Sequence, residues 1–169
     1  KPTFTLSPEL SLLIKTPRVL FNISNGSAGY EKDQPLLSNI FLSIQSGDRV
    51  CFIGNNGSGK STLLKALLGD SNLFKTGEWL LEPHKNIGYF DQHYSLFHLD
   101  KISKNPPLEF LKNLSPDWTE AELRTHLASF LFRKTEEVNT PISQLSGGEL
   151  ARLALAVIAI KTPAVLLLD

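Results

Sequence analysis

The stretch that decides the fold is residues 54–62, which read GNNGSGKST. It has the frame G-x-x-x-x-G-K-S, which is the frame of a phosphate-binding loop. The apolar run RVCFI, residues 49–53, precedes it, and its composition predicts a β-strand. The run TLLKALLG, residues 62–69, overlaps its end, with leucines at helical spacing and a glycine as stop signal. A strand, a glycine-rich loop and a helix in this order are the context in which the motif holds phosphate.

The residue types in this loop indicate how it would hold a phosphorylated ligand. Gly57 and Gly59 allow the backbone to turn its N–H groups toward phosphate oxygens, and the helix start adds the positive end of its dipole. We expect Lys60 to reach the β- and γ-phosphates and Ser61 to bind Mg²⁺. The two asparagines are expected to shape the loop, since Asn tolerates left-handed backbone. The predicted ATP-binding residues of the loop are Gly54, Asn55, Asn56, Gly57, Ser58, Gly59, Lys60, Ser61 and Thr62.

A second motif, LSGGE, occupies residues 145–149 and opens an apolar helix. Ser146 and Glu149 have the spacing of a capping box, which explains them as local structure. The box does not explain Gly147 and Gly148, because glycine costs about 1 kcal/mol in a helix. A glycine pair allows close approach to the backbone, and phosphate is the natural ligand of an exposed helix N-terminus.

With these two motifs in this order, the chain resembles an ATP-binding-cassette (ABC) nucleotide-binding domain from about Val19 to Asp169. In that family the LSGG signature of one cassette covers the γ-phosphate that the phosphate loop of a second cassette holds. The resemblance therefore implies a second cassette as partner. It also implies a signature surface for that partner's ATP, formed by Leu145, Ser146, Gly147, Gly148 and Glu149.

Three further positions match elements of the family. Tyr30, in SAGYEKDQPLL, stands where the aromatic residue that stacks on adenine is expected, although it could also be a strand-edge aromatic. Gln92, in IGYFDQH, matches the glutamine that touches Mg²⁺ and the attacking water. Asp169 ends the apolar run AVLLLD, which predicts a buried strand, and matches the Walker B aspartate. The resemblance implies ATP and Mg²⁺ as cofactors, Lys60, Gln92 and Asp169 as catalytic residues, and Ser61, Gln92 and Asp169 as Mg²⁺ ligands.

Within the ABC family the chain most resembles the soluble ABC-F branch. Glu149 stands where transporter cassettes usually carry Gln, and residues 121–156 are close in sequence to the same segment of ABC-F proteins. The opening KPTFTLSP resembles the start of the second of two cassettes. The resemblance implies a cytoplasmic ATPase whose two cassettes close as a clamp, on the ribosome in translation. The alternatives are the ATP-hydrolysing subunit of a membrane transporter, and a switch in which nucleotide binding rather than turnover carries the signal.

The predicted fold is α/β: a P-loop NTPase of the ABC type with a mainly parallel core sheet, an antiparallel side sheet and a small helical subdomain, truncated at Walker B. We expect residues 1–17 to be a linker or edge segment and 18–169 a partial nucleotide-binding domain, with the helical subdomain at about 101–145. In the family a water-orienting carboxylate follows the Walker B aspartate, so this piece is expected to be hydrolytically incomplete.

Two apolar segments, residues 19–24 and 36–45, predict the antiparallel side sheet. Two shorter strands are expected at 77–81 and 87–90. A capping box of Thr119 and Glu122 predicts a helix that runs to about Phe132. Its expected apolar face consists of Leu123, Leu127, Phe130 and Leu131.

Composition is that of an ordinary globular protein. The chain has 169 residues, of which 41% are hydrophobic, and a net charge of zero, so no global field attracts it to nucleic acid. The single cysteine, Cys51, excludes an internal disulfide, suits a reducing cytosol and is expected in the core. The four histidines lack metal-ligand spacing. The longest strictly apolar run, residues 153–160, is short of the roughly 20 residues of a membrane span. The N-terminus shows no signal-peptide pattern. The chain contains no methionine, even at position 1, so we expect a piece of a longer protein.

Overall fold

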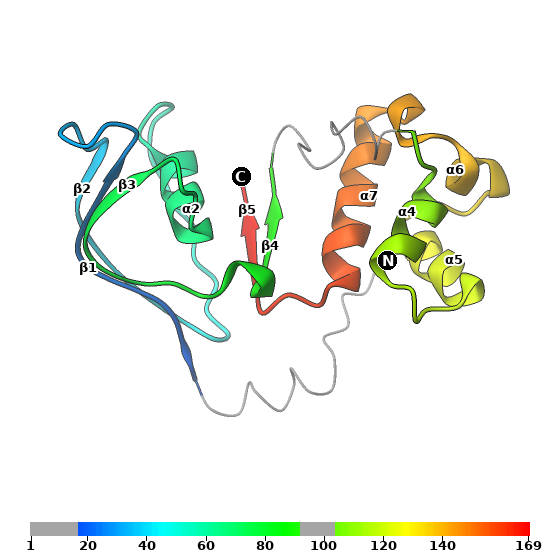
Figure 1. Cartoon of the computed structure of the whole chain (residues 1–169), viewed down its shortest axis with the longest axis horizontal. Helices are drawn as coiled ribbons and strands as arrows, with labels where there is room; N and C mark the ends of the chain where they lie inside the picture. Colours follow the sequence, from blue (N-terminus) through cyan, green and yellow to red (C-terminus); the bar gives the residue numbers. More distant parts are fainter. Residues whose placement is uncertain (1–16, 92–103) are drawn as a thin grey trace. The chain divides into compact units, whose positions relative to one another are not determined.

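The computed structural model describes residues 17–91 and 104–169, and these fall into two compact units. The first, here called the sheet unit, consists of residues 17–89, 164–167 and Asp169. The second, the helical unit, consists of Leu168 and the described residues between Phe90 and Pro163. Figure 1 draws the elements of both, and each unit is described by itself.

The sheet unit is built on three antiparallel strands in the order β2-β1-β3 (Figure 1). These are β1 (Val19–Gly29), β2 (Leu37–Gln45) and β3 (Phe74–Leu80). In β1, Phe21 and Ile23 are buried while Asn22 between them is exposed, which is the alternation of a sheet with one covered face. Helix α2 (Lys60–Leu68) covers that face, because Leu64 and Leu67 belong to the same buried cluster as Phe21 and Ile23. The antiparallel side sheet predicted from the sequence is confirmed.

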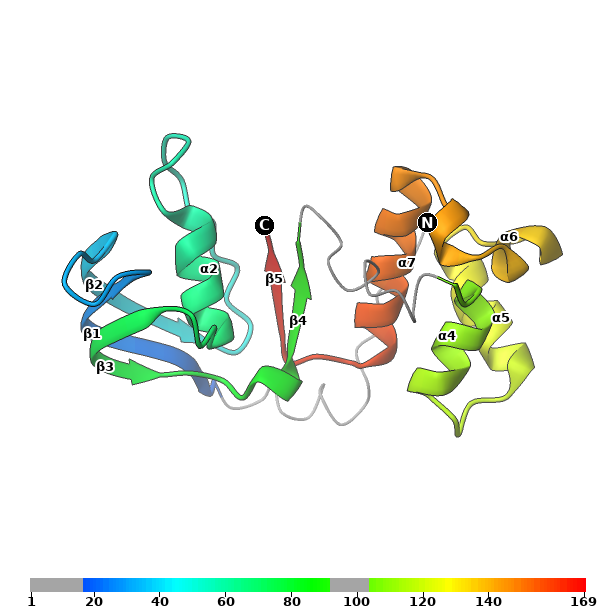
Figure 2. The same ribbon diagram turned by 45° about the horizontal axis from the view of Figure 1, so that its top comes forward.

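A second sheet pairs β4 (Ile87–Phe90) with β5 (Val165–Leu168). The two strands begin at the same end, where the Ala164 N–H donates to the Asn86 carbonyl at 2.8 Å, and Figures 1 and 2 show them running in the same direction. The preceding turn η1 (His84–Asn86) is anchored at the buried Glu82 carboxylate. That carboxylate accepts hydrogen bonds from Arg18 at 2.9 Å and from the Asn86 side chain at 2.6 Å. This network stabilises the point from which β4 and β5 start.

The strand predicted at residues 49–53 is not formed, which corrects the sequence prediction. Ile53 is 93% exposed, and Cys51, expected in the core, is exposed as well. A strand needs a neighbour to accept and donate its backbone hydrogen bonds, and this segment has none among the described strands. The strand expected at the C-terminal end is confirmed as β5, but Leu168 is 60% exposed, because the sheet it joins has two strands.

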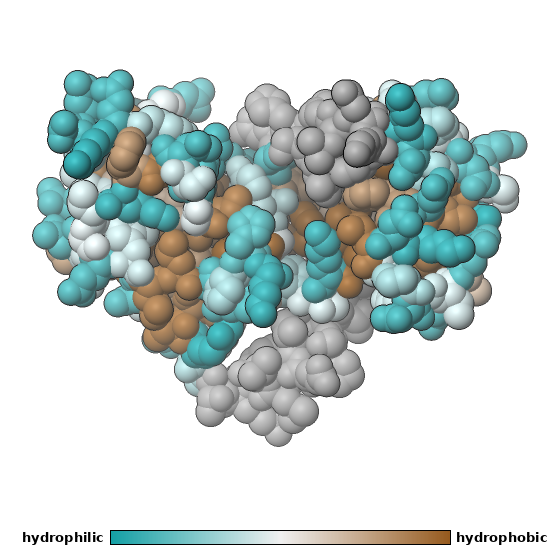
Figure 3. Space-filling model, in the orientation of Figure 1, coloured by the Kyte–Doolittle hydropathy of each residue, from teal (hydrophilic) through white to brown (hydrophobic). Residues whose placement is uncertain are grey.

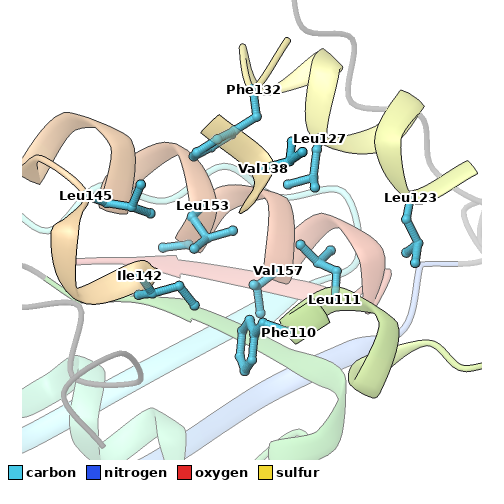
Figure 4. Packing of buried hydrophobic residues seen from close by; sticks show 11 residues of the cluster. Phe110, Leu111, Leu123, Leu127, Phe132, Val138, Ile142, Leu145, Leu153 and Val157 are labelled. Carbon is cyan, nitrogen blue, oxygen red and sulfur yellow. The ribbon is translucent and has the colours of Figure 1, made fainter. Parts of the chain in front are cut away.

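The helical unit contains α4 (Pro107–Leu114), α5 (Glu120–Ser129), α6 (Thr135–Asn139), the turn η3 (Ile142–Gln144) and α7 (Gly147–Ile160). Its core is a single buried cluster to which all of them contribute. Figure 4 shows these side chains gathered between the helices. The most completely buried members are Leu111, Leu123, Leu127, Ile142 and Leu153. This core holds α7, whose first turn carries the LSGGE motif.

The capping box predicted at Thr119 and Glu122 is present, but the helix it opens is shorter than expected. The chain turns back in a Schellman motif, in which the Phe132 N–H donates to the Leu127 carbonyl at 3.1 Å. Leu131 takes the left-handed conformation of this motif, with φ of 71°, and is 48% exposed. The predicted apolar face is therefore right for Leu123 and Leu127 and wrong for Leu131. Phe132 is buried against Leu127 instead.

Candidate functional site

The phosphate-binding loop owes its shape to two glycines. Gly57 and Gly59 have φ angles of 81° and 90°, in the left-handed region that favours glycine. A Cβ atom on Gly59 would also lie only 2.7 Å from the Leu37 side chain. Asn55 and Asn56 were expected to shape the loop because Asn tolerates left-handed backbone, but neither has a positive φ, and the left-handed positions of the loop are Gly57 and Gly59.

The N-terminus of α2 differs from those of α5 and α7. No side chain caps it, whereas α5 and α7 each begin with a complete capping box. The first N–H groups of a helix have no partner within it, so at α2 they remain available to an anion. The Thr62 side chain is buried, so its contribution to such a site is limited to the backbone N–H.

Lys60 closes the loop on itself. Its ammonium group donates to the carbonyls of Gly54 and Asn55, both at 2.9 Å. An ammonium has three N–H donors, and these two bonds leave one for a phosphate oxygen. These two loop carbonyls thus hold the positive charge of Lys60 at the N-terminus of α2 without the help of a nucleotide.

Ser61 and Asp169 lie 108 residues apart in the sequence and are hydrogen-bonded in the structure. The Ser61 hydroxyl donates to Asp169 Oδ1 at 2.7 Å, and the Tyr89 hydroxyl donates to Asp169 Oδ2 at 3.2 Å. Tyr89 was not predicted from the sequence, and no local signal could have identified it, because only the pairing of β4 with β5 brings it to Asp169.

This arrangement fits Mg²⁺ by the chemistry of its donors. Mg²⁺ prefers oxygen ligands and is usually held by one or two protein groups, with waters and substrate phosphates completing the shell. A serine hydroxyl can donate its hydrogen to Asp169 and still offer a lone pair to a metal. In the part of the chain that the structure describes, no three His, Cys, Asp or Glu side chains form a metal cluster.

Two further residues were predicted for the nucleotide site, Tyr30 and Gln92, and the structure describes only Tyr30. Tyr30 follows β1 and is 50% exposed. The turn that begins there ends at Leu36 and Leu37, whose side chains approach Gly59, so Tyr30 belongs to a turn that borders the phosphate loop. Gln92, predicted as a Mg²⁺ and water contact, lies outside the described residues.

The LSGGE motif forms the first turn of α7, with Ser146 as N-cap. Glu149 Oε2 accepts from the Ser146 backbone N–H at 2.7 Å and from its hydroxyl at 2.6 Å, which confirms the predicted capping box. These hydrogen bonds from Ser146 lower the pKa of Glu149, and the positive charge of Arg152 adds to the effect. The motif therefore has a rigid, charged first turn.

The glycine pair of the motif is not required by packing. Gly147 and Gly148 are exposed, neither has a positive φ, and a Cβ on Gly147 would meet nothing within 4 Å. The Arg152 guanidinium, which the sequence prediction missed, lies one turn on, 3.8 Å from a Cβ atom placed on Gly148. Two glycines that the fold does not need, next to a cation, form a surface suited to the close approach of an anion.

Comparisons with known proteins identify the family. The family model described as ABC transporter matches residues 37–169. The chain belongs to this family, whose members bind ATP, generally with Mg²⁺. In the residues that the structure describes, no helix is long and apolar enough to cross a bilayer.

The relatives it matches are ABC-F proteins, so the predicted resemblance to that branch is confirmed. "Probable ATP-binding protein YheS" of Haemophilus influenzae is 39% identical over 99% of this chain and 25% of its own length. Protein GCN20 of Saccharomyces cerevisiae is 32% identical over 89% of this chain and 19% of its own length. "ABC transporter F family member 5" of Arabidopsis thaliana is 34% identical over 90% of this chain and 21% of its own length. The chain thus spans about a quarter or less of these relatives.

Solved structures agree on the fold. CbiO1 of Clostridium perfringens, part of the ABC transporter complex cbiONQ, matches with a TM-score of 0.66 at 21% identity, over 89% of this chain and 65% of its own. A bacterial Atm1-family ABC exporter with ATP bound matches with a TM-score of 0.65 at 22% identity, over 90% of this chain and 29% of its own. The predicted P-loop NTPase fold of the ABC type is confirmed.

Proposed function

We propose that this chain is the Mg·ATP-binding cassette of a protein that hydrolyses ATP to drive the closure of two cassettes. The observation that carries the proposal is the arrangement at the start of α2. An uncapped helix N-terminus, the Lys60 ammonium and the Ser61–Asp169 pair converge within the sheet unit. Phosphoryl transfer needs the γ-phosphate held, its charge neutralised and a water aligned, and these groups supply the first two.

The assignment of roles follows from the chemistry of each group. The backbone N–H groups of residues 57–62 and the Lys60 ammonium bind the phosphates, while Ser61 and Asp169 hold Mg²⁺, which neutralises phosphate charge when bound. Tyr30 stacks on adenine. Gln92 contacts the metal and the attacking water, as the resemblance to the ABC family implies. The surface formed by Ser146, Gly147, Gly148 and Glu149 binds the ATP of a second cassette, while Leu145, predicted as part of this surface, is buried in the core of the helical unit.

We further propose that the whole protein acts on the ribosome in translation, in the cytoplasm. The support is the likeness to ABC-F proteins over nine-tenths of this chain, together with Glu149 at the end of the signature. In the ABC-F branch, closure of the two cassettes by ATP positions the linker between them against the ribosome.

Sedimentation of the full-length protein through a sucrose cushion tests this role. We expect the protein to pellet with ribosomes in the presence of a non-hydrolysable ATP analogue, and to stay in the supernatant with ADP. Membranes from the same cells, floated on a density gradient, are the comparison. Association with a membrane fraction and not with ribosomes would favour the transporter subunit instead.

A further inference from the structure

The Asp169 carboxylate is held at both of its oxygens, and the second of these contacts belongs to no motif. Ser61 donates to Oδ1 and Tyr89 donates to Oδ2, at 2.7 and 3.2 Å. Tyr89 lies on β4 and Asp169 directly follows β5, the strand with which β4 pairs. The pairing of the two strands therefore sets the position of the phenol hydroxyl.

The Tyr89 ring and its hydroxyl have separable tasks. The ring packs, partly buried, against the hydrophobic cluster of the sheet unit that includes Leu64 and Ile87. The hydroxyl reaches out of this cluster to the carboxylate, so removing the oxygen alone leaves the packing of the ring in place. An effect of that removal that disappears when Asp169 is also replaced would therefore come from the contact with Asp169.

A carboxylate held at one oxygen can still rotate about its Cβ–Cγ bond, and a second hydrogen bond stops this rotation. Orientation matters here, because Mg²⁺ demands near-ideal octahedral geometry. Carboxylates that bind metals are themselves hydrogen-bonded by outer groups, and loss of such a group typically lowers metal affinity about 10- to 100-fold. Each carboxylate oxygen has two lone pairs, so both can accept a hydrogen bond and still face a metal.

We propose that Tyr89 is a positioning residue, which orients the Asp169 carboxylate for the Mg²⁺ that accompanies ATP. The inference rests on the proposed function, since it assumes that Asp169 serves the metal of a bound nucleotide. It adds a residue on β4 whose role is to keep Oδ2 of Asp169 fixed while Ser61 fixes Oδ1.

The test uses the full-length protein and the substitution Tyr89→Phe. Mn²⁺ replaces Mg²⁺, and its binding in the presence of a non-hydrolysable ATP analogue is followed by electron paramagnetic resonance. We expect Tyr89→Phe to weaken Mn²⁺ binding at this cassette by about 10-fold or more. Binding of the same analogue in EDTA, without metal, should stay within about twofold of the wild type, because the loop and Lys60 are unchanged.

The matched control is Thr76→Val, which removes a side-chain hydroxyl that is hydrogen-bonded to Ser27 in the antiparallel sheet. It should leave Mn²⁺ affinity unchanged. Adding Tyr89→Phe to Asp169→Asn should cause no further loss, because the tyrosine acts through the aspartate. Both proteins in this last comparison carry Asp169→Asn. Their Mn²⁺ affinities can therefore be compared even if Tyr89→Phe lowers the melting temperature.

The outcomes distinguish this inference from the proposed function. Equal Mn²⁺ affinity of Tyr89→Phe and the wild type, or a further loss on the Asp169→Asn background, would overturn the role of Tyr89 and leave the ATP site standing. A wild-type protein that binds neither the nucleotide analogue nor Mn²⁺ at this cassette would overturn both.

Discussion

At the scale of single residues, Lys60 and Ser61 are neighbours with different structural tasks. The Lys60 side chain turns back over the loop to the carbonyls of Gly54 and Asn55. The Ser61 side chain points the other way, to Asp169. Two consecutive residues at the start of α2 thus connect the helix to its own loop and to the end of a distant strand.

Removal of the Lys60 ammonium should weaken nucleotide binding by about 10- to 100-fold. A hydrogen bond to a charged group contributes about 1.5–3 kcal/mol, and each 1.4 kcal/mol is a factor of ten in affinity. Calorimetric titration of Lys60→Ala with Mg·ATP measures this change. The control is Lys65→Ala, in the last turn of the same helix. Affinities of Lys60→Ala and the wild type that agree would remove the assignment of the loop.

At the scale of secondary-structure elements, the helices divide by how they begin. Helices α5 and α7 close their first turns with their own side chains, through Thr119 and Glu122 and through Ser146 and Glu149. Helix α2 has no such cap. The two capping boxes satisfy first-turn N–H groups locally, whereas those of α2 remain available to a ligand.

Loss of the α7 cap should lower stability measurably. Replacing an N-cap serine by alanine costs about 1 kcal/mol, which in a domain of 150–250 residues lowers the melting temperature by about 2–4 °C. Differential scanning calorimetry of Ser146→Ala measures this. Ser143→Ala, an exposed position in η3, serves as the control and should melt like the wild type. A drop of equal size in the control would mean that the cap contributes nothing particular.

The capping carboxylates also predict the response to acid. Glu122 and Glu149 each have a lowered pKa, chiefly because a Ser or Thr hydroxyl donates to the carboxylate, and backbone N–H groups lower the pKa of Glu137. A lowered pKa in the folded state means that the stabilisation is complete above the ordinary value of 4.5. It is lost as the pH falls through the lower, folded value, because protonation is then easier in the unfolded chain.

We therefore expect thermal melts from pH 7 to pH 3 to separate the wild type from the triple variant Glu122→Gln, Glu137→Gln, Glu149→Gln. Glutamine can also complete a capping box but does not titrate near these values. The stability advantage of the wild type over the variant should shrink below pH 4.5. A difference in melting temperature that is the same at every pH would contradict this account.

At the scale of the whole molecule, apolar side chains remain at the surface. Figure 3 shows brown, apolar surface over the part of the view where Figure 1 draws β1 and β3. Large exposed hydrophobic residues of the sheet unit include Val19, Phe41 and Leu80. Other exposed hydrophobic residues are Val50 and Ile53 in the unformed strand, and Leu166 and Leu168 on β5. Contiguous apolar surface of this kind is typical of interaction sites and of aggregation-prone edges.

The 169-residue chain by itself should accordingly self-associate as its concentration rises. Light scattering coupled to size-exclusion chromatography would show a mass that increases with concentration. Ile53→Lys should reduce this association, because Ile53 is 93% exposed in a segment that pairs with none of the strands the structure describes. Phe41→Lys, on β2, is the comparison, since Phe41 is 71% exposed in a segment that is already paired. A mass that stays monomeric at all concentrations would contradict the prediction.

The sequence by itself determined the features that depend on local interactions. The turn at Gly57 and Gly59, the stop of α2 at Gly69 and the capping boxes at Thr119 and Ser146 were all predicted correctly, because each needs only residues a few positions apart. The two strands of the side sheet were also predicted from their apolar composition, and β1 shows the alternation of a strand with one buried face.

Only the tertiary structure decided which apolar runs became paired strands and which distant residues met. Residues 49–53 and β5 look alike in composition, yet among the strands of residues 17–91 and 104–169 only β5 has a neighbour to complete its hydrogen bonds. The contact of Tyr89 with Asp169 joins residues 80 positions apart, and that of Ser61 with Asp169 joins residues 108 apart. Such contacts depend on how strands pair in space, and no spacing in the sequence encodes them.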